Sequence, residues 1–287
     1  MQKPQHRTIQ IPLIGGLGNQ LFQYAGGLAI TKNISSEIQF FDDLIRGSKM
    51  LKITPRKVAI NSLLGCNIVT LGKLEVSKML VKRLIIKNYW LNDSVEKPLE
   101  ISQISPNTKV ISGYFQSRFL VNQVFDQLLH GLAASNSFSP IVPKFQRNEI
   151  TVHMRLGDKL TRKEIRYFGR TSIDYYLKGI EHLCAEHQYD SINIVSDQPF
   201  LARQMLSAVE QKYKFNYSIG SNEIEDLALI SHSRGIVMSC SSFSWWGAKL
   251  ASVNSNTQVV APSHWLHKPS GFDYLMNEKH WKLVNKE

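Results

Sequence analysis

Several short segments carry residue types whose spacing could bind an anion or move a proton. The first is GGLGNQLFQYAGG (15–27), in which Gly16 and Gly18 precede the amide side chain of Asn19. A glycine-rich turn before a helix lets backbone N–H groups approach a phosphate. Leu21 stands where a dinucleotide fingerprint needs its third glycine, and the Gly-Lys-Ser/Thr ending of a phosphate loop is absent. A tight turn without a ligand is the alternative interpretation.

The segment HMRLGDK (153–159) follows an apolar run that predicts a strand. Arg155 offers a planar, permanently charged fork that suits a phosphate. His153 could hydrogen-bond a ligand, and Asp158 could accept a proton. The structural alternative is an ion pair between Arg155 and Asp158 beside a buried histidine.

Two further groups follow later predicted strands. In SCSSFSWWGAKLA (239–251), Ser241 and Ser242 are suited to the start of a helix, whose N–H groups can hold a phosphate. Asp197 ends the strand SINIVSD and could accept hydrogen bonds from a ribose or a base. Helix capping alone is the alternative for all three, and the tryptophans after Ser242 are expected in the core.

Metal-binding patterns are missing from the sequence. It contains no Asp-x-Asp pair, no HExxH and no Cys/His cluster of ligand spacing. We therefore expect no metal and no other cofactor. The charge of a bound diphosphate would then be balanced by Arg155, helix N-termini and glycine-turn amides.

A parallel α/β architecture is predicted to position these segments. Residues 8–16 and 37–43 predict strands on either side of a helix over 19–33, which is a βαβ opening. A polar, proline-containing stretch at 135–148 predicts a linker, after which the pattern restarts. The later strands are predicted at 149–154, 191–197, 235–239 and 257–263, and the later helices at 171–187, 199–213, 223–233 and 245–252. We expect two Rossmann-like α/β domains, 1–145 and 146–287, that face a cleft holding the site.

Composition indicates a folded protein without a membrane span. The chain has 287 residues, 43% of them hydrophobic, and no apolar run of about 18 residues. Its first residues lack the pattern of a secretory signal, and its three cysteines form no CxxC pair. These features lead us to expect a cytoplasmic location.

Positive charge is concentrated in the first half. Residues 1–145 carry 17 Lys and Arg against 8 Asp and Glu, and ten of these cations lie between Arg46 and Lys87. The excess predicts an anionic partner, and we expect peripheral contact with the inner face of the cytoplasmic membrane. A solvated basic face is the alternative. Nucleic acid is disfavoured because no zinc finger or RNP pattern accompanies the charge. Residues 73–90 mix cations and apolar residues, but the cations do not gather on one side of a helix.

In family order and spacing, four motifs resemble the α-1,2-fucosyltransferase family: GGLGNQLFQYA, GYFQS (113–117), HMRLGD and SSFSWWGAKLA. Bacterial members that build O-antigen or similar surface glycans look most similar, and the resemblance covers residues 8–266. It implies an inverting, metal-independent glycosyltransferase of the GT-B type. The expected reaction moves L-fucose from GDP-fucose to the 2-hydroxyl of a terminal galactose in a glycan. The basic half would be the acceptor side, with the acceptor carried on a lipid diphosphate.

The resemblance also implies roles for single residues. Arg155 matches a diphosphate-binding arginine with His153 beside the nucleotide, and Asn19 would face the donor phosphates or the acceptor. Asp197 matches an acid aimed at guanine, and Ser241 and Ser242 match a phosphate-binding turn. Asp158 is the expected catalytic base.

Departures from the family pattern occur beside these residues. Leu156 and Lys159 stand where a second arginine and an aromatic residue are common, and Gln198 replaces a second acid. Two other functions are considered. An oxidoreductase on a doubly wound sheet is disfavoured by Leu21, and a non-catalytic glycan- or nucleotide-binding protein is disfavoured by the intact set of site residues.

Overall fold

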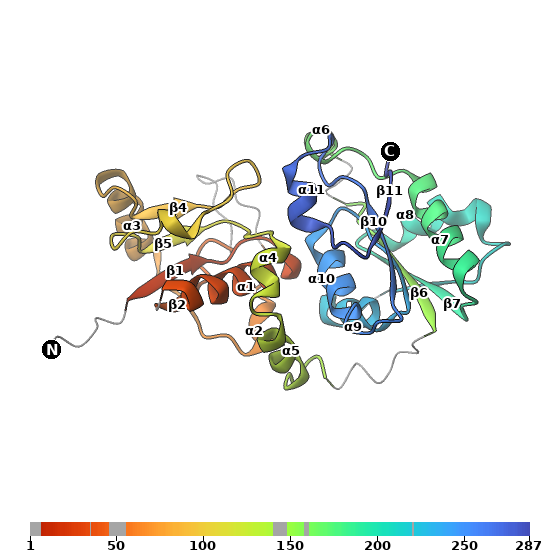
Figure 1. Cartoon of the computed structure of the whole chain (residues 1–287), viewed down its shortest axis with the longest axis horizontal. Helices are drawn as coiled ribbons and strands as arrows, with labels where there is room; N and C mark the ends of the chain where they lie inside the picture. Colours follow the sequence, from red (N-terminus) through yellow and green to blue (C-terminus); the bar gives the residue numbers. More distant parts are fainter. Residues whose placement is uncertain (1–6, 35, 46–55, 140–147, 158–160, 220) are drawn as a thin grey trace. The chain divides into compact units, whose positions relative to one another are not determined.

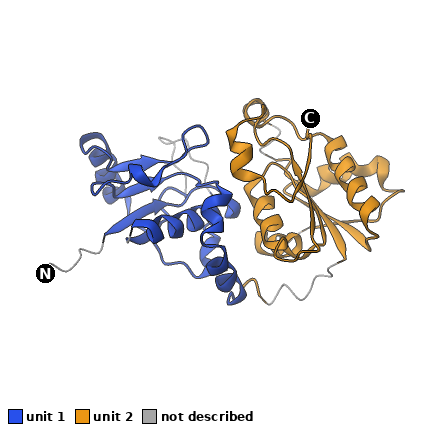
Figure 2. Cartoon of the chain, in the orientation of Figure 1, with its two compact units in different colours: residues 1–135 blue, residues 136–287 orange. Residues whose placement is uncertain are grey.

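A computed structural model describes residues 7–34, 36–45, 56–139, 148–157, 161–219 and 221–287. The chain divides into two compact units, Met1–Ser135 and Asn136–Glu287 (Figure 2). The domain boundary predicted at residues 145 and 146 lies outside the described residues. Each unit contains its own parallel sheet.

Unit 1 is built on a five-stranded sheet in the order β3-β2-β1-β5-β4 (Figure 1). The central strand β1 pairs in parallel with both β2 and β5, and its Ile9 and Ile11 are fully buried. Residues two apart in a strand share one face of the sheet, so both isoleucines point into the same part of the core. The elements of unit 1 are β1 (Thr8–Pro12), α1 (Leu17–Ile34), β2 (Glu37–Phe41), α2 (Ile60–Leu64), β3 (Ile68–Val69), α3 (Lys73–Ile85), β4 (Trp90–Asn92), η1 (Ile101–Gln103), β5 (Val110–Ser112), α4 (Arg118–Asn122) and α5 (Phe125–Ala133).

Unit 2 is built on a six-stranded sheet in the order β11-β10-β9-β6-β7-β8. Every pairing is parallel, so the carboxyl ends of all six strands lie at one edge. Its elements are β6 (Glu149–Met154), α6 (Arg162–Phe168), α7 (Ile173–Glu186), β7 (Ser191–Ser196), α8 (Pro199–Leu206), η4 (Ser207–Val209), β8 (Phe215–Tyr217), α9 (Glu223–His232), β9 (Gly235–Val237), α10 (Ser242–Ala251), β10 (Gln258–Pro262), α11 (Gly271–Met276) and β11 (Lys282–Val284).

Side-chain caps fix where the helices of unit 2 begin. The Oγ of Ser172 accepts a hydrogen bond from the Tyr175 N–H at the start of α7, at 3.2 Å. At the start of α9, Asn222 caps two N–H groups and forms a capping box with Glu225. Such caps satisfy the orphan N–H groups of a first turn. They explain why α9 starts directly after a polar loop.

The α/β fold predicted from the sequence is confirmed, with differences at the ends of elements. Helix α8 stops at Leu206, and α10 begins at Ser242, earlier than predicted. Short strands such as β3 and β8 were not predicted, because two or three residues show no periodicity. Trp245 and Trp246 are fully buried, as expected for core residues. In the described part of the chain, no helix combines the length and apolar character that a bilayer crossing needs.

Candidate active site

In unit 2, the neighbouring strands β7, β6 and β9 bring the predicted residues together at their carboxyl ends. Arg155 follows β6, and its Nη1 lies 3.3 Å from Oδ2 of Asp197, which follows β7. The Asp197 carboxylate also accepts hydrogen bonds from two backbone N–H groups, those of Leu156 at 2.8 Å and Gly157 at 3.1 Å. These three contacts fix the turn that carries Arg155.

The acid that pairs with Arg155 in the described structure is Asp197, forty-two positions further along the chain. Asp158, the acid expected from sequence proximity, lies outside the described residues. The Arg155 and Asp197 side chains are 30% and 24% exposed, so both charged groups can still meet a ligand. Each Asp197 oxygen retains acceptor capacity beyond its backbone contact.

His153 lies behind this turn and is 4% exposed. Its Nδ1 lies 2.8 Å from the Oγ of Ser239, and its ring packs 5.5 Å from that of Phe243. Burial, and to a lesser degree the charge of Arg155, lower the pKa of His153 to about 3, so the imidazole is neutral. His153 is therefore a buried, neutral group in contact with Ser239, which lies in the loop before α10.

Helix α10 points its N-terminus at the same edge of the sheet. Ser241 is its N-cap, and its Oγ accepts a hydrogen bond from the Phe243 N–H at 3.3 Å. Ser242 is the first helical residue, and both serines are half-buried. The N-terminus of a ten-residue helix is a partial positive charge that favours an anion.

A cavity of about 610 Å³ opens beside Arg155. Its volume is in the range of small-molecule sites. Arg155, Ser239 and Cys240 line it together with residues 168–173, and His267 and Glu287 also contribute. Residues 168–173 were not predicted to belong to the site, although Gly169 is a signal there. Its φ is +75°, a conformation that favours glycine.

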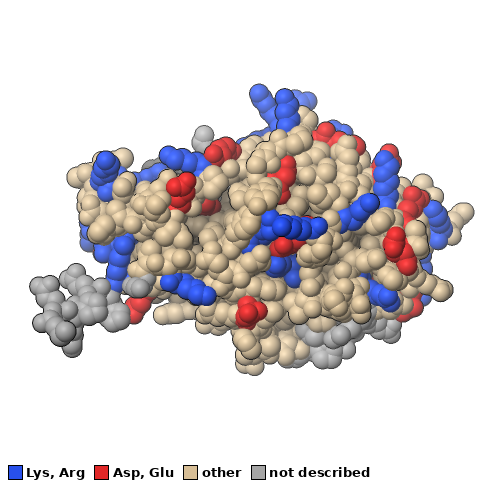
Figure 3. Space-filling model, viewed as in Figure 1, with Lys and Arg blue, Asp and Glu red and all other residues tan. Residues whose placement is uncertain are grey.

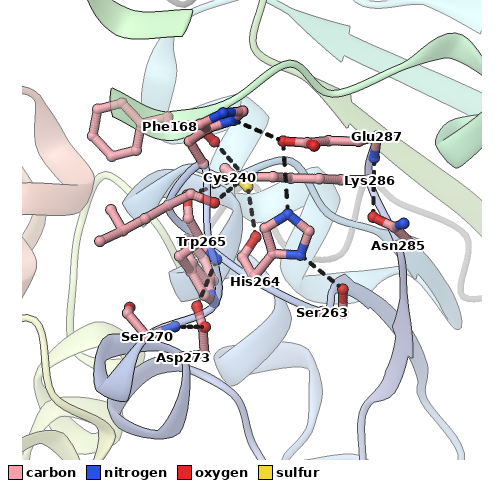
Figure 4. Close-up of polar contacts among 12 residues, drawn as sticks. Phe168, Cys240, Ser263, His264, Trp265, Ser270, Asp273, Asn285, Lys286 and Glu287 are labelled. Carbon is pink, nitrogen blue, oxygen red and sulfur yellow. Dashed lines mark hydrogen bonds and ion pairs between the residues drawn. The ribbon is translucent and has the colours of Figure 1, made fainter. Parts of the chain in front are cut away.

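One wall of the cavity is braced by a buried cation (Figure 4). Lys286 is fully buried, and its Nζ donates hydrogen bonds to the carbonyl groups of Phe168, Leu266 and Trp265. A buried ammonium is tolerated only when such acceptors compensate its lost hydration. Phe168 lines the cavity, and Lys286 follows strand β11. The hydrogen bonds of Lys286 therefore connect the cavity wall to the end of β11.

Unit 1 holds a second candidate site at the glycine-rich turn. Gly15, rather than the predicted Gly16 and Gly18, is the glycine that the turn requires, because its φ is +79° and a Cβ there would lie 2.5 Å from the Nδ2 of Asn19. A Cβ on Gly16 would meet no atom within 4 Å, so that position is open on its outer side. Gly18 is buried within α1.

Two glutamines of α1 hold this turn from inside. The Gln20 amide donates to the carbonyls of Gly15 and Lys57 and accepts from the N–H groups of Ala59 and Ile60. Gln23 is also fully buried and donates to the carbonyls of Pro12 and Gly113. The hydrogen bonds of the Gln20 side chain all go to backbone groups of the protein. Of the pair Asn19 and Gln20, Asn19 is therefore the residue whose side chain is available to a ligand.

Asn19 is oriented by the GYFQS segment. Its Oδ1 accepts a hydrogen bond from the Nε2 of Gln116 at 2.9 Å, whereas no acceptor for its Nδ2 is found among the described residues. The GYFQS backbone is itself held by Asp93, whose Oδ2 accepts from the Phe115 N–H at 2.7 Å. Phe115 has a φ of +51°, an uncommon value for a residue with a side chain. This strained turn fixes Gln116 and thereby the Asn19 amide.

Comparison with known proteins identifies the family. The sequence profile of glycosyl transferase family 11 matches residues 1–281. The chain belongs to this family. The protein is therefore a glycosyltransferase, and the resemblance drawn from the four motifs is confirmed. The oxidoreductase hypothesis is set aside.

Two relatives from Escherichia coli match this glycosyltransferase over most of its length. The O-antigen biosynthesis glycosyltransferase WbnK is 24% identical over 283 residues, covering 88% of this chain and 93% of its own. An alpha-1,2-colitosyltransferase is 23% identical over 290 residues, covering 96% and 98%. The crystal structure of POFUT1 in complex with GDP aligns with a TM-score of 0.50 at 12% identity, over 90% of this chain and 99% of that one. The two Rossmann-like domains are thus a fold shared with the POFUT1 structure.

Among the described residues, no three His, Cys, Asp or Glu side chains lie together in a way that could hold an ion. The candidate groups facing an anion in unit 2 are a guanidinium and a helix N-terminus.

Proposed function

We propose that this glycosyltransferase moves L-fucose from GDP-fucose to the 2-hydroxyl of a terminal galactose in a glycan of the O-antigen type. The reaction inverts the configuration at C1 of fucose. The observation that carries the proposal is the edge formed by β6, β7 and β9, where Arg155, Asp197 and the α10 N-terminus lie together. Its support from relatives is the O-antigen glycosyltransferase and the GDP-bound neighbour.

The site chemistry suits a nucleotide diphosphate. The Arg155 guanidinium provides parallel N–H donors for phosphate oxygens, and the α10 N-terminus adds further donors with a favourable dipole. Asp197 holds the guanidinium in place through its 3.3 Å contact. The cavity of about 610 Å³ next to Arg155 has room for a nucleoside.

In the proposed mechanism, the acceptor hydroxyl attacks fucose C1 on the face opposite GDP. The bond between C1 and the β-phosphate oxygen breaks through an oxocarbenium-like transition state. Arg155 and the α10 N-terminus stabilise the negative charge that grows on the leaving β-phosphate. Asp158 takes the acceptor proton, and Asn19 contributes its amide to the donor phosphates or the acceptor. No metal is needed in this scheme.

The donor is tested first by calorimetric titration with GDP, GDP-fucose and NAD, each with and without EDTA. We expect GDP and GDP-fucose to bind equally well in both conditions and NAD not to bind. Transfer to galactosides is then followed by chromatography, and the linkage is read by NMR. Loss of GDP binding in EDTA would contradict the metal-free scheme, and absence of GDP binding in any condition would overturn the donor assignment.

A second donor is favoured by the colitosyltransferase relative. Colitose is fucose without its 3-hydroxyl, so the two donors differ by one polar group. A site that hydrogen-bonds this hydroxyl rejects the deoxy sugar strongly, by about 10⁴–10⁵ in kcat/KM. Competition between GDP-fucose and GDP-colitose therefore decides the sugar. A preference for GDP-colitose would replace fucose in the proposal and leave the nucleotide site unchanged.

The base is tested with Asp158→Asn. General-base catalysis contributes about 10²–10⁴ to turnover, so we expect at least a hundredfold loss with GDP affinity retained. A matched control is Asp190→Asn, because Asp190 lies at the opposite, amino end of β7. Turnover above about a tenth of wild type in the Asp158 variant would exclude it as the base.

A further inference from the structure

Helix α3 of unit 1 has two apolar faces. Its inner face packs against the sheet through Val76, Met79 and Leu80, in a cluster with Trp90 and Phe41. Its outer face exposes 71%, 54%, 86% and 76% of the side chains of Leu74, Val81, Leu84 and Ile85. We call these four residues the α3 stripe. Monomeric proteins scatter single apolar residues over their surface, whereas four on one helix form a patch.

The spacing of the α3 stripe places its members on one side of the helix. At about 100° per residue, Leu74, Val81 and Ile85 fall within roughly 40° of one another, and Leu84 lies about 60° from Val81. The inner face lies on the opposite side, so α3 is apolar on two sides rather than one.

Cations border the α3 stripe on both sides. On the same wheel, Lys73 lies at one border, and Lys78 and Lys82 lie at the other. The only acid between residues 73 and 87 is Glu75, which pairs with Lys78 at 3.3 Å. Lys and Arg side chains are visible at the left end of the molecule in Figure 3, where Figure 1 places α3.

A hollow of about 440 Å³ lies next to α3. Lys82 and Lys109 both line this hollow, together with Ile86, Tyr89 and Asn107. Two ammonium groups in one hollow favour an anionic group. Lys82 therefore belongs both to the border of the α3 stripe and to this hollow.

We propose that the α3 stripe docks on an anionic lipid bilayer. The four apolar side chains enter the boundary between headgroups and acyl chains, and the bordering lysines contact lipid phosphates. A second copy of the chain fits less well, because a two-fold contact through this face would bring its lysine rows together. The inference stands apart from the proposed donor and acceptor, since docking needs no sugar nucleotide.

The test is flotation of the full chain with vesicles of phosphatidylcholine and phosphatidylglycerol, against phosphatidylcholine alone. We expect binding to the anionic vesicles only. The double variant L84Q/I85Q should weaken it about tenfold or more, since two large apolar side chains no longer leave water. The variant K73Q/K82Q should weaken it about tenfold at low salt and should make the remaining binding less sensitive to salt.

A matched control is I219Q/V253Q, which changes two apolar residues of unit 2 that are 60% and 59% exposed. It should bind vesicles like wild type. All changed side chains are exposed, and thermal denaturation checks that each variant is folded. A Leu84→Trp variant adds direct evidence, because brominated lipid should quench its additional emission.

Three results would overturn the proposal. They are failure of the wild-type chain to float with anionic vesicles, equal flotation of L84Q/I85Q and wild type, and unquenched emission from a tryptophan at position 84. Sedimentation velocity without lipid tests the competing occupant of the α3 stripe, which is a second copy of the chain. A dimer that L84Q/I85Q dissociates would assign the α3 stripe to a second copy of the chain.

Discussion

Asn19, in the first turn of α1 in unit 1, and Arg155, at the strand edge of unit 2, are both polar side chains that follow a parallel strand, but they are held differently. Asn19 is positioned by neutral amides, with Gln116 bonding it directly and Gln20 bracing its turn. Arg155 is positioned by a charge, the Asp197 carboxylate. The second arrangement suits an anion, whereas the first suits a neutral hydroxyl or carbonyl.

This difference predicts that the two sites respond differently to mutation, nucleotide and salt. Unit 2 should account for the binding of GDP, and unit 1 should act mainly on the transfer step. The experiments below can separate the two sites or show that they act together.

The largest effect is expected from Arg155→Ala. Turnover should fall by about 10²–10³, because the growing charge of the β-phosphate loses its main partner and meets the Asp197 carboxylate instead. GDP affinity should fall as well, and the loss should shrink as ionic strength rises. Steady-state kinetics and calorimetry measure both. Arg203→Ala is the control, since that side chain is 65% exposed and contacts Glu210. Near-normal turnover in the Arg155 variant would refute the charge-based role of unit 2.

A smaller effect is expected from Asn19→Ala. Removing one neutral hydrogen-bonding amide from a site costs about 1–3 kcal/mol, which is roughly a 5- to 150-fold loss of kcat/KM. GDP affinity should stay within about twofold, and the loss should not depend on salt. Asn33→Ala, at the exposed end of the same helix, should leave kcat/KM unchanged. A parallel loss of GDP affinity would place Asn19 at the donor phosphates and erase the contrast between the units.

The glycine turn of unit 1 is tested by the pair Gly15→Ala and Gly16→Ala. The first forces a side chain into a φ of +79° and against Asn19, and should lower the free energy of unfolding by about 1–3 kcal/mol. The second meets no atom within 4 Å, so its cost should be less than half as large. Urea denaturation ranks the two variants. Equal costs would mean that the turn does not depend on the conformation of Gly15.

The smallest effect concerns the pH dependence of unit 2. The pKa of His153, about 3, lies below the ordinary value of 6.5, so between these values the unfolded chain binds a proton that the folded chain does not. The free energy of unfolding should therefore fall as pH drops below 6.5, by about 1.4 kcal/mol per pH unit. His153→Asn should remove this slope, and the exposed His280→Asn should not. Denaturation curves at pH 6.5 and 5.5 provide the measurement, and an unchanged slope in His153→Asn would assign the acid sensitivity to other groups.

The part of unit 2 that holds Arg155 and Asp197 could be predicted from its sequence because β6 and β7 are six residues long and mostly buried. The alternation of strands and helices placed Arg155, Asp197 and Ser241 after three separate strands, and parallel topology then put them at one edge. The pairing of Arg155 with Asp197 could not be predicted, because it depends on β6 and β7 being neighbours. Sequence distance favoured Asp158, which is three positions away and lies outside the described residues.

Unit 1 was harder to predict because the contacts around its glycine-rich turn join helix α1 to segments far along the chain. Gln20 bonds to residues 57, 59 and 60, and Gln23 bonds to Gly113, so their structural roles depend on segments that carry no pattern of their own. The same holds for the cavity wall of unit 2. Lys286 lies just after β11, and nothing in the sequence around it indicates that its side chain is fully buried.

The order of strands in unit 2 has a consequence for how the site forms during synthesis. Strand β6 pairs with β7 soon after both emerge, but its other partner, β9, begins 81 residues after Met154. At the usual pace of translation this interval is roughly 4–16 s. Asp197 is made part-way through this interval, and β9 begins 38 residues after it, so for this later part the growing chain holds Arg155 and Asp197 but neither β9 nor α10. The proposed GDP site is therefore complete only late in the synthesis of this unit, after α10 has been made.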